Sequence, residues 1–301
     1  MATKIYITGA RGRLGRIVLG EIKAIPIVRK ETGLENEIVS DFSLENLKQI
    51  LSDADVVIHL AGSRDFLDKK KSWEGNVELT RRIVEAMPKT AKIIFSSSVS
   101  VYGKKLAEIP ANEGTPVNPD TAYAKTKLEA EKIVSVHPNH VILRIGPVYG
   151  PGFAEYFKVL HMISKGKMAV IGKGNNHIPF VHVADVARAI KNAIEKGCGI
   201  YVLVGECLSQ NDIYAIAAGK MKVKPPQKHM PVLLAKIFAH LELRRTTHFG
   251  GKALFIPEDI AVLSSDRIFN CNKARRELGF SPRPLEEGLA EMIKKYKEYK
   301  S

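Results

Sequence analysis

Short apolar runs alternate with helical patterns through the first half of this chain. The runs that read as buried strands are residues 4–8, 25–28, 56–60, 92–96 and 140–145. The segments between them that read as helices are residues 12–23, 43–51, 77–87 and 121–136. Such alternation predicts an α/β fold, a doubly wound parallel sheet with helices on both faces.

The second half of the chain is less regular and divides the predicted fold into two lobes. Residues 183–195 and 200–204 read as one more helix and strand that return to the main sheet, whereas the chain from residue 206 is mainly helical. We therefore assign residues 1–146 and 177–205 to a Rossmann-like, NAD(P)-binding lobe. Residues 147–176 and 206–301 form a smaller, mainly C-terminal substrate lobe.

A glycine-rich loop follows the first strand and opens the first helix. Gly9, Gly12 and Gly15 are spaced three residues apart, which differs from the G-x-G-x-x-G form but meets similar physical demands. Glycine permits a tight turn and close approach of backbone N–H groups to a pyrophosphate, whose charge the helix N-terminus favours. The residues of this loop that we predict to bind a dinucleotide are Gly9, Arg11, Gly12, Arg13, Leu14 and Gly15.

The residue at the end of the second strand is expected to determine whether the protein prefers NAD or NADP. An acid there accepts a hydrogen bond from the ribose 2′-hydroxyl, whereas an arginine suits a 2′-phosphate. The strand ends at Arg29, so we favour NADP; the alternative is a solvated Arg29 with Glu31 supplying an acid. Asp41 and Phe42 either cover the adenine of the cofactor or form the N-terminal cap of a helix. The full set of cofactor contacts predicted at strand ends is Arg29, Asp41, Phe42, Leu60, Ala61 and Gly62.

Tyr123 and Lys127 are spaced four residues apart in a predicted helix, which places the phenol and the ammonium on one face. The positive charge favours the phenolate and lowers the pKa of the tyrosine toward neutrality. A tyrosine tuned in this way exchanges a proton at a carbon that bears oxygen, while a dinucleotide carries the hydride. The pair therefore predicts alcohol–ketone redox chemistry.

The net charge is +14 and is concentrated in the second half of the chain. Residues 219–252 hold eight basic side chains against Glu242 alone. We favour a solvated basic surface; the alternative is a field that attracts an anionic substrate such as a nucleotide derivative. Nucleic-acid binding is disfavoured, because the basic residues are not interleaved with stacking aromatics.

The remaining composition points to a cytoplasmic protein without a metal site. Cys198, Cys207 and Cys271 lie at unrelated spacings, which predicts reduced thiols. No apolar run approaches the ~18 residues of a membrane span. The chain enters a strand almost at once, without a basic and then apolar leader.

Several motifs in a fixed order extend these observations along nearly the whole chain. They are Gly9-x-x-Gly12-x-x-Gly15, residues 55–62, Asn76-Val77, residues 95–103, Tyr123-x-x-x-Lys127, Arg144, residues 148–151, residues 180–187 and residues 274–280. The ordered set resembles the extended short-chain dehydrogenase/reductase family, which includes NAD-dependent epimerases and dehydratases. The resemblance implies that Tyr123 is the general acid/base, Lys127 its charge partner and a ribose ligand, and Ser98 a donor to the reacting oxygen.

The resemblance also limits the types of reaction that this chain is expected to catalyse. Asn76 would help to hold the site and its cofactor, with a helix cap as the alternative. Family dehydratases carry an Asp-Glu pair where this chain has Val99 and Ser100, so a sugar 4,6-dehydratase is disfavoured. Val99 and Ser100 would then contact the substrate beside Ser98, and simple alcohol–ketone redox remains.

At two positions that bear on the substrate, the chain differs from the sugar-nucleotide enzymes of this family. Pro147 stands where many sugar-nucleotide enzymes place an asparagine, and His177 lies near the position of their nucleotide-binding arginine; we predict both as substrate contacts. The pattern is similar also to the steroid-dehydrogenase and dihydroflavonol-reductase-like branch. We predict a nucleotide-sugar epimerase-type enzyme. The alternative is an NADPH-dependent carbonyl reductase or 3β-hydroxysteroid-dehydrogenase-like enzyme.

Two further possibilities rest on the family alone. A non-catalytic dinucleotide-binding protein on the same fold is less favoured, because Ser98, Tyr123 and Lys127 are all kept. Helices 77–87 and 121–136 often pair in family dimers, so the resemblance implies a homodimer.

Overall fold

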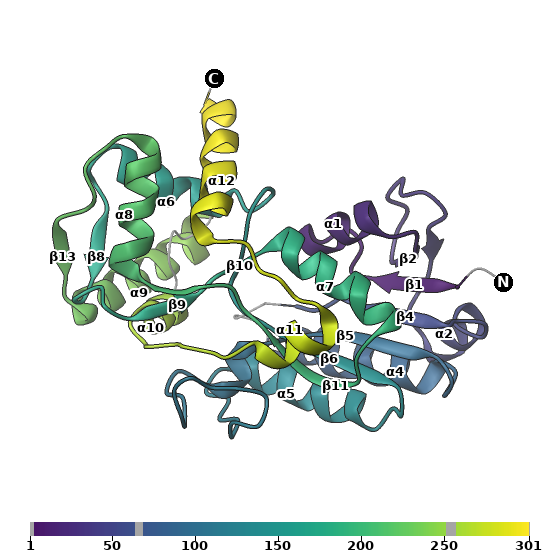
Figure 1. Cartoon of the computed structure of the whole chain (residues 1–301). Helices are drawn as coiled ribbons and strands as arrows, with labels where there is room; N and C mark the ends of the chain where they lie inside the picture. Colours follow the sequence, from purple (N-terminus) through teal and green to yellow (C-terminus); the bar gives the residue numbers. More distant parts are fainter. Residues whose placement is uncertain (1–2, 64–68, 251–256, 301) are drawn as a thin grey trace.

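A seven-stranded parallel sheet forms the centre of the computed structural model, which describes residues 3–63, 69–250 and 257–300 (Figure 1). Its strand order is β11-β6-β5-β4-β1-β2-β3, and every neighbouring pair is parallel. The strands are β1 (Ile5–Thr8), β2 (Ile25–Val28), β3 (Ile38–Val39), β4 (Val56–His59), β5 (Lys92–Ser98), β6 (His140–Ile145) and β11 (Gly199–Leu203). The predicted Rossmann-like fold is confirmed, including the return of the chain to the sheet at β11.

Helices cover both faces of this sheet. The helices are α1 (Arg13–Glu21), α2 (Leu44–Ile50), α3 (Lys69–Trp73), α4 (Leu79–Ala86), α5 (Ala122–Ser135) and α7 (Val183–Glu195). α1 and α7 pack together over one face, whereas α2, α4 and α5 pack over the other. Consecutive strand residues alternate between the two cores: Ile93 belongs to the α4/α5 side and Ile94 to the α1/α7 side. Both faces are therefore buried, which explains the continuous apolar runs.

The segment that we predicted as one helix over residues 77–87 is different in the structure. A π-helical turn, Glu74–Glu78, precedes α4, which begins at Leu79. This wider turn contains Asn76, whose buried side chain bonds two other elements. Hydrophobic spacing carries no signal for such a turn, which depends on long-range hydrogen bonds.

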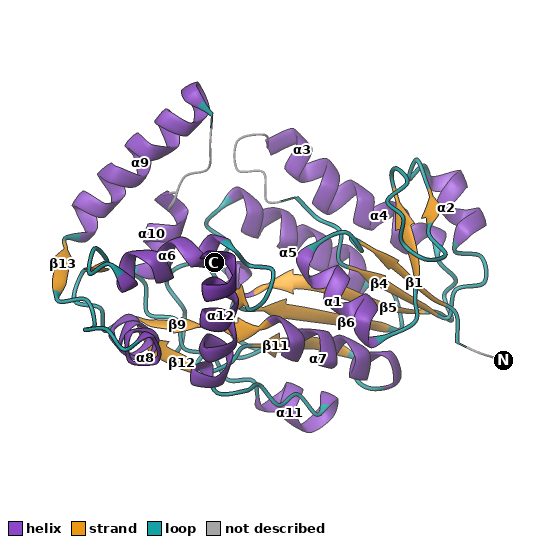
Figure 2. Cartoon of the chain, turned by 90° about the horizontal axis from the view of Figure 1, so that it is seen from above, coloured by secondary structure: helices purple, strands orange, loops and turns teal. Residues whose placement is uncertain are grey.

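Most of the remaining elements gather beside the carboxyl ends of the sheet strands, whereas α11 lies alongside the sheet (Figure 2). The helices are α6 (Glu155–Ser164), α8 (Gln210–Met221), α9 (Val232–Phe249), α10 (Pro257–Leu263), α11 (Asn272–Leu278) and α12 (Leu285–Lys300). The short strands are β7 (Val148–Tyr149), β8 (Ala169–Ile171), β9 (His177–Pro179), β10 (Val181–His182), β12 (Cys207–Ser209) and β13 (Lys228–Met230). Helices α6, α8 and α12 share a separate apolar core, whereas α11 packs on β11.

Candidate active site

The glycine loop joins β1 to α1 in a conformation that excludes a side chain at Gly9 and at Gly15. Gly9 has φ +74°, and a Cβ there would lie 2.5 Å from the backbone nitrogen of Ala61 at the end of β4. A Cβ on Gly15 would overlap the carbonyl oxygen of Gly9. Gly9 therefore permits the contact between two strand ends, and Gly15 permits the close approach of α1 to the loop.

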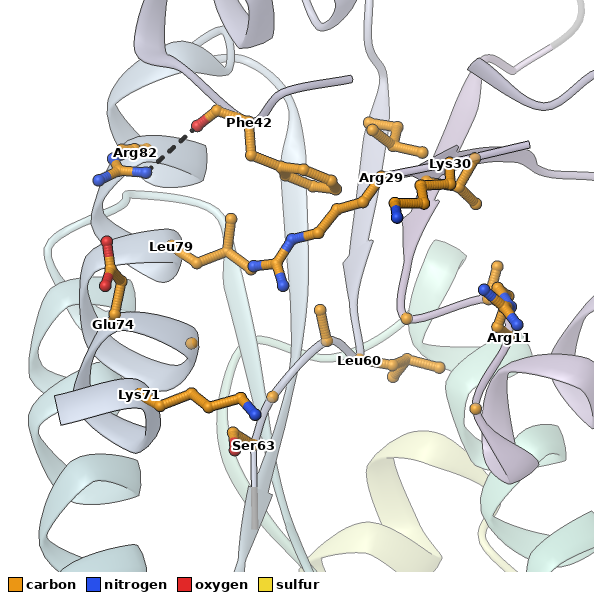
Figure 3. A pocket seen from close by; sticks show the side chains of 18 of the residues that line it. Arg11, Arg29, Lys30, Phe42, Leu60, Ser63, Lys71, Glu74, Leu79 and Arg82 are labelled. Atoms are coloured by element: carbon orange, nitrogen blue, oxygen red, sulfur yellow. Dashed lines mark hydrogen bonds between the residues drawn. The ribbon is translucent and has the colours of Figure 1, made fainter. Parts of the chain in front are cut away.

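A cavity of about 1110 Å³ opens at the carboxyl ends of β1, β2 and β4 (Figure 3). This is the edge of a doubly wound sheet where ligands bind. The predicted cofactor residues that line it are Gly9, Arg11, Gly12, Arg29, Asp41, Phe42, Leu60, Ala61 and Gly62. The volume, the close backbone approach at Gly9 and the exposed helix start fit a dinucleotide.

Cations dominate the wall of this cavity. The basic residues are Arg11, Arg29, Lys30, Lys70, Lys71 and Arg82, and the acidic residues are Asp41 and Glu74. Our sequence analysis missed the members contributed by α3, the π-helical turn and α4. They do not follow a strand, so strand-end reasoning could not find them; only the basic run Lys69-Lys70-Lys71 was a signal.

Phe42 forms one side of the cavity and holds a guanidinium over its ring. The Cζ of Arg29 lies 5.7 Å from the centroid of the Phe42 ring, and Arg82 donates to the Phe42 carbonyl at 3.4 Å (Figure 3). Asp41 accepts from the backbone N–H of Ser43 at 2.8 Å, and this bond lowers the pKa of its carboxyl group. Asp41 thus belongs both to the cavity wall and to the turn that opens α2.

Three residues of the predicted glycine loop, Arg13, Leu14 and Gly15, lie outside the cavity lining. Arg13 forms an ion pair with Glu155 of α6, and its Cζ lies 4.2 Å from the centroid of the Phe153 ring. Leu14 packs against the apolar core beneath α1. In this structure, Arg13 connects the loop to the second group of elements, and Gly15 is buried below it.

Lys127 is buried directly behind the cavity. Its ammonium donates to the Ser96 carbonyl at 2.8 Å and lies 4.7 Å from the Phe95 ring centroid. A Cβ on Gly62 would lie 3.3 Å from this Nζ, so Gly62 leaves only a thin wall between the ammonium and the cavity. Burial lowers the pKa of Lys127 to about 8, although Glu131 opposes the shift.

Tyr123 and Ser98 lie on the two elements that meet at Lys127. Thr121 caps α5 by accepting from the Ala124 N–H at 3.1 Å, which makes Tyr123 the second residue of the helix, half-buried and one turn before Lys127. Ser98 ends β5, the strand against which α5 packs, and its hydroxyl accepts from the Ser100 N–H at 3.2 Å.

Asn76 connects the cavity wall to α5. Its amide nitrogen donates to the Ser63 carbonyl at 2.8 Å and to the Thr126 hydroxyl at 3.0 Å, and its oxygen accepts from the Ser63 N–H at 2.7 Å. The side chain is buried within the π-helical turn, so it is a bridge rather than a helix cap. π-Helical turns are frequent at functional sites.

A buried arginine that our sequence analysis missed lies beside Val99 and Ser100. Arg267 donates to the Val99 carbonyl at 2.8 Å, and burial lowers its pKa to about 10. The Ser100 hydroxyl is buried without a hydrogen-bond partner among the described residues. No motif surrounds Arg267 in the sequence, and nothing marked it as buried.

The two other predicted substrate residues, Pro147 and His177, are not among the residues that line the large cavity, and the same is true of Ser98, Val99 and Ser100. The carbonyl of Pro147 accepts from the Val181 N–H at 3.0 Å. His177 uses its ring Nδ1 to contact Asp266 at 2.7 Å, and its backbone N–H bonds the same carboxylate at 2.9 Å. Asp266 therefore occupies one ring nitrogen of His177.

Fold and cavity together define a Rossmann-type dinucleotide-binding protein of the short-chain dehydrogenase/reductase kind. The chain belongs to the NAD dependent epimerase/dehydratase family, whose model matches residues 5–205.

Similar proteins act on different substrates. N-acetyl-alpha-D-glucosaminyl-diphospho-ditrans,octacis-undecaprenol 4-epimerase of Escherichia coli O157:H7 is 28% identical over 259 residues, 81% of this chain and 78% of that protein. Sterol-4-alpha-carboxylate 3-dehydrogenase, decarboxylating, of Dictyostelium discoideum is 21% identical over 317 residues, covering 92% and 95%. UDP-glucose 4-epimerase of Thermotoga maritima shares the fold with a TM-score of 0.76 at 20% identity, covering 99% and 100%.

Proposed function

We propose that this protein is an NAD(P)-dependent epimerase-type oxidoreductase. It acts at a hydroxyl-bearing carbon of a sugar that is attached to a diphosphate, as in a nucleotide sugar. The observation that carries the proposal is the buried ammonium of Lys127, one turn after Tyr123 and directly behind Gly62 of the cavity. The printed names of an epimerase relative and of a solved neighbour both specify a sugar attached to a diphosphate. The net charge of +14 suits that anionic class.

The proposed mechanism assigns a step to each residue of the chain. The nicotinamide, when bound, supplies reversible hydride transfer. The Tyr123 phenolate takes the proton of the substrate hydroxyl as its carbon gives up hydride, and Ser98 donates to the oxygen of the resulting ketone. Lys127 keeps the phenolate favoured. The ketone then rotates to present its opposite face. Return of the hydride and the proton to that face inverts the configuration of the carbon.

An assay of substrate turnover tests this proposal. The purified protein is incubated with UDP-glucose, UDP-N-acetylglucosamine or simple ketones, with NAD or NADP present, while NMR follows epimers and absorbance follows the nicotinamide. We expect epimer formation without net change in reduced cofactor, and tightly bound NAD(P), mainly in its oxidised form, in the denatured extract of the purified protein. Ketone reduction that consumes NADPH in equal amount would establish the carbonyl-reductase alternative instead.

We propose NADP as the preferred cofactor, because Arg29 lies at the end of β2 in a cavity rich in cations. We expect Arg29→Ala to weaken NADPH binding about tenfold or more with little effect on NADH, since a charge-assisted hydrogen bond contributes about 1.5–3 kcal/mol. Fluorescence titration of both reduced cofactors measures the two dissociation constants. Arg16→Ala, exposed on α1 outside the cavity, is the matched control. Equal weakening of both cofactors contradicts the proposal.

The homodimer implied by the family resemblance is part of the same proposal. It would form through α4 and α5. Static light scattering tests it, and the mass of a single chain would exclude it.

A further inference from the structure

Helix α9 carries its large apolar side chains on the outside. Leu233, Phe238 and Leu241 are 70%, 60% and 57% exposed, whereas the inward-facing Ala235 and Ala239 are 3% and 4% exposed. Ten large hydrophobic residues are exposed in the described part of the chain, and half of them lie on this one helix. The five are Leu233, Leu234, Ile237, Phe238 and Leu241.

These five residues form one continuous stripe, which we call the outer face of α9. Their spacing of one, three and four residues places them on one side of a helix with 3.6 residues per turn. The opposite side packs its alanines on Ile171 and Ile260. Figure 2 shows α9 at the edge of the molecule, extending away from the sheet. The inner face therefore needs only small residues, and packing within the chain does not explain the large outer ones.

Positive charge surrounds the outer face. Lys236, Arg244 and Arg245 are exposed on α9 itself, and three exposed lysines, Lys222, Lys224 and Lys228, precede it. Glu242 is the only acid in residues 219–250, and it pairs with Arg245 at 2.8 Å. An apolar stripe rich in Leu, Ile and Phe with flanking Lys and Arg matches a helix that lies in the plane of an anionic bilayer. Pairing with a second copy would bring like charges together.

We propose that α9 binds the surface of anionic membranes, with its outer face inserted at the boundary between headgroups and acyl chains. No helix within the described ranges is long and apolar enough to cross a bilayer. Binding in this way holds the neighbouring helix α10 and strand β8, on which α9 packs, close to the lipid surface. The inference does not depend on the proposed reaction, because the contact needs no turnover.

Vesicle sedimentation with the full-length protein tests the proposal. Vesicles of phosphatidylcholine with 30% phosphatidylglycerol are compared with pure phosphatidylcholine, at low and high salt. We expect binding to the anionic vesicles, weakened by salt and by Lys236→Gln/Arg244→Gln. Substitution Ile237→Gln/Phe238→Gln/Leu241→Gln should lower the partition coefficient at least about tenfold, since burying each CH₂ contributes to membrane affinity.

The matched control removes exposed apolar residues elsewhere. Ile109→Gln/Val136→Gln changes residues that are 53% and 77% exposed and lie far from α9 in the sequence, and it should bind like the wild type. Thermal unfolding verifies that each variant is folded. The proposal is overturned if anionic vesicles do not retain the wild type, or if the triple variant binds them equally well. It is also overturned if light scattering shows a dimer that the triple variant dissolves while vesicles bind neither protein.

Discussion

Tyr123→Phe should lower kcat by about 10³-fold and leave the fold intact, because general acid–base catalysis by a positioned side chain contributes roughly 10²–10⁴-fold. The substitution removes one oxygen from a half-buried residue at the start of α5. The ring remains to fill its place, so the unfolding temperature and the affinity for NAD(P)H should stay close to those of the wild type.

Stopped-flow or steady-state assays on the substrate identified by the NMR screen give kcat, and fluorescence titration gives the cofactor affinity. Tyr299→Phe is the control, since this phenol is 78% exposed near the end of α12 and should not change turnover. Full activity in Tyr123→Phe would falsify the proposed mechanism while leaving cofactor binding at the cavity unaffected.

The variant Lys127→Met distinguishes the role of Lys127 from that of Tyr123. The ammonium stabilises the phenolate, so its removal should raise the pH at which activity reaches half its maximum, in addition to lowering kcat. Methionine fills a similar volume beside Phe95 without a charge. A pH profile that falls in amplitude but does not move would assign Lys127 a role in holding Ser96 rather than in tuning Tyr123.

The parts of the fold and site that the sequence predicts are those that depend on local chemistry. Gly9 and Gly15 are predictable because backbone conformation and close contact exclude any side chain at those positions. Asp41, Phe42 and Gly62 were found because they follow strands of a parallel sheet, whose carboxyl ends converge on one edge. The position of Tyr123 one turn before Lys127 follows from helical spacing alone.

Features that depend on long-range contacts were not predictable in this way. The helical spacing of Leu233, Ile237 and Leu241 is typical of a buried face, yet the structure buries the alanines between them. Arg267 and Glu131 look like ordinary surface residues of polar segments, but partners distant in sequence bury both. Only the assembled fold determines which side of a helix meets another element.

A buried ion pair fixes helix α5 to the sheet. Glu131 of α5 accepts from Arg144 of β6 at 2.8 Å and 3.1 Å, and the Ser97 hydroxyl of β5 donates to the same carboxylate. Arg144 also donates to the Tyr102 hydroxyl at 2.8 Å, which donates in turn to the Asn112 carbonyl. The side chains of the pair are only 5% and 4% exposed, so water replaces none of these bonds.

Glu131→Gln should destabilise the protein by about 3–5 kcal/mol, because it leaves the Arg144 guanidinium buried without a countercharge. The unfolding temperature should fall by roughly 5–8 °C, as measured by calorimetry. Glu129→Gln is the matched control: its pair with Lys132 on the same helix is exposed, and such pairs contribute about 0–1 kcal/mol.

The double variant Glu131→Leu/Arg144→Met distinguishes a positioning role from a purely stabilising one. Replacing both charges by apolar groups avoids the unpaired ion, so this variant should be more stable than Glu131→Gln. If the pair also positions α5, kcat should remain low in the double variant even where stability returns, since Tyr123 and Lys127 depend on the placement of that helix. Recovery of both stability and kcat would show that α5 keeps its position without the ion pair.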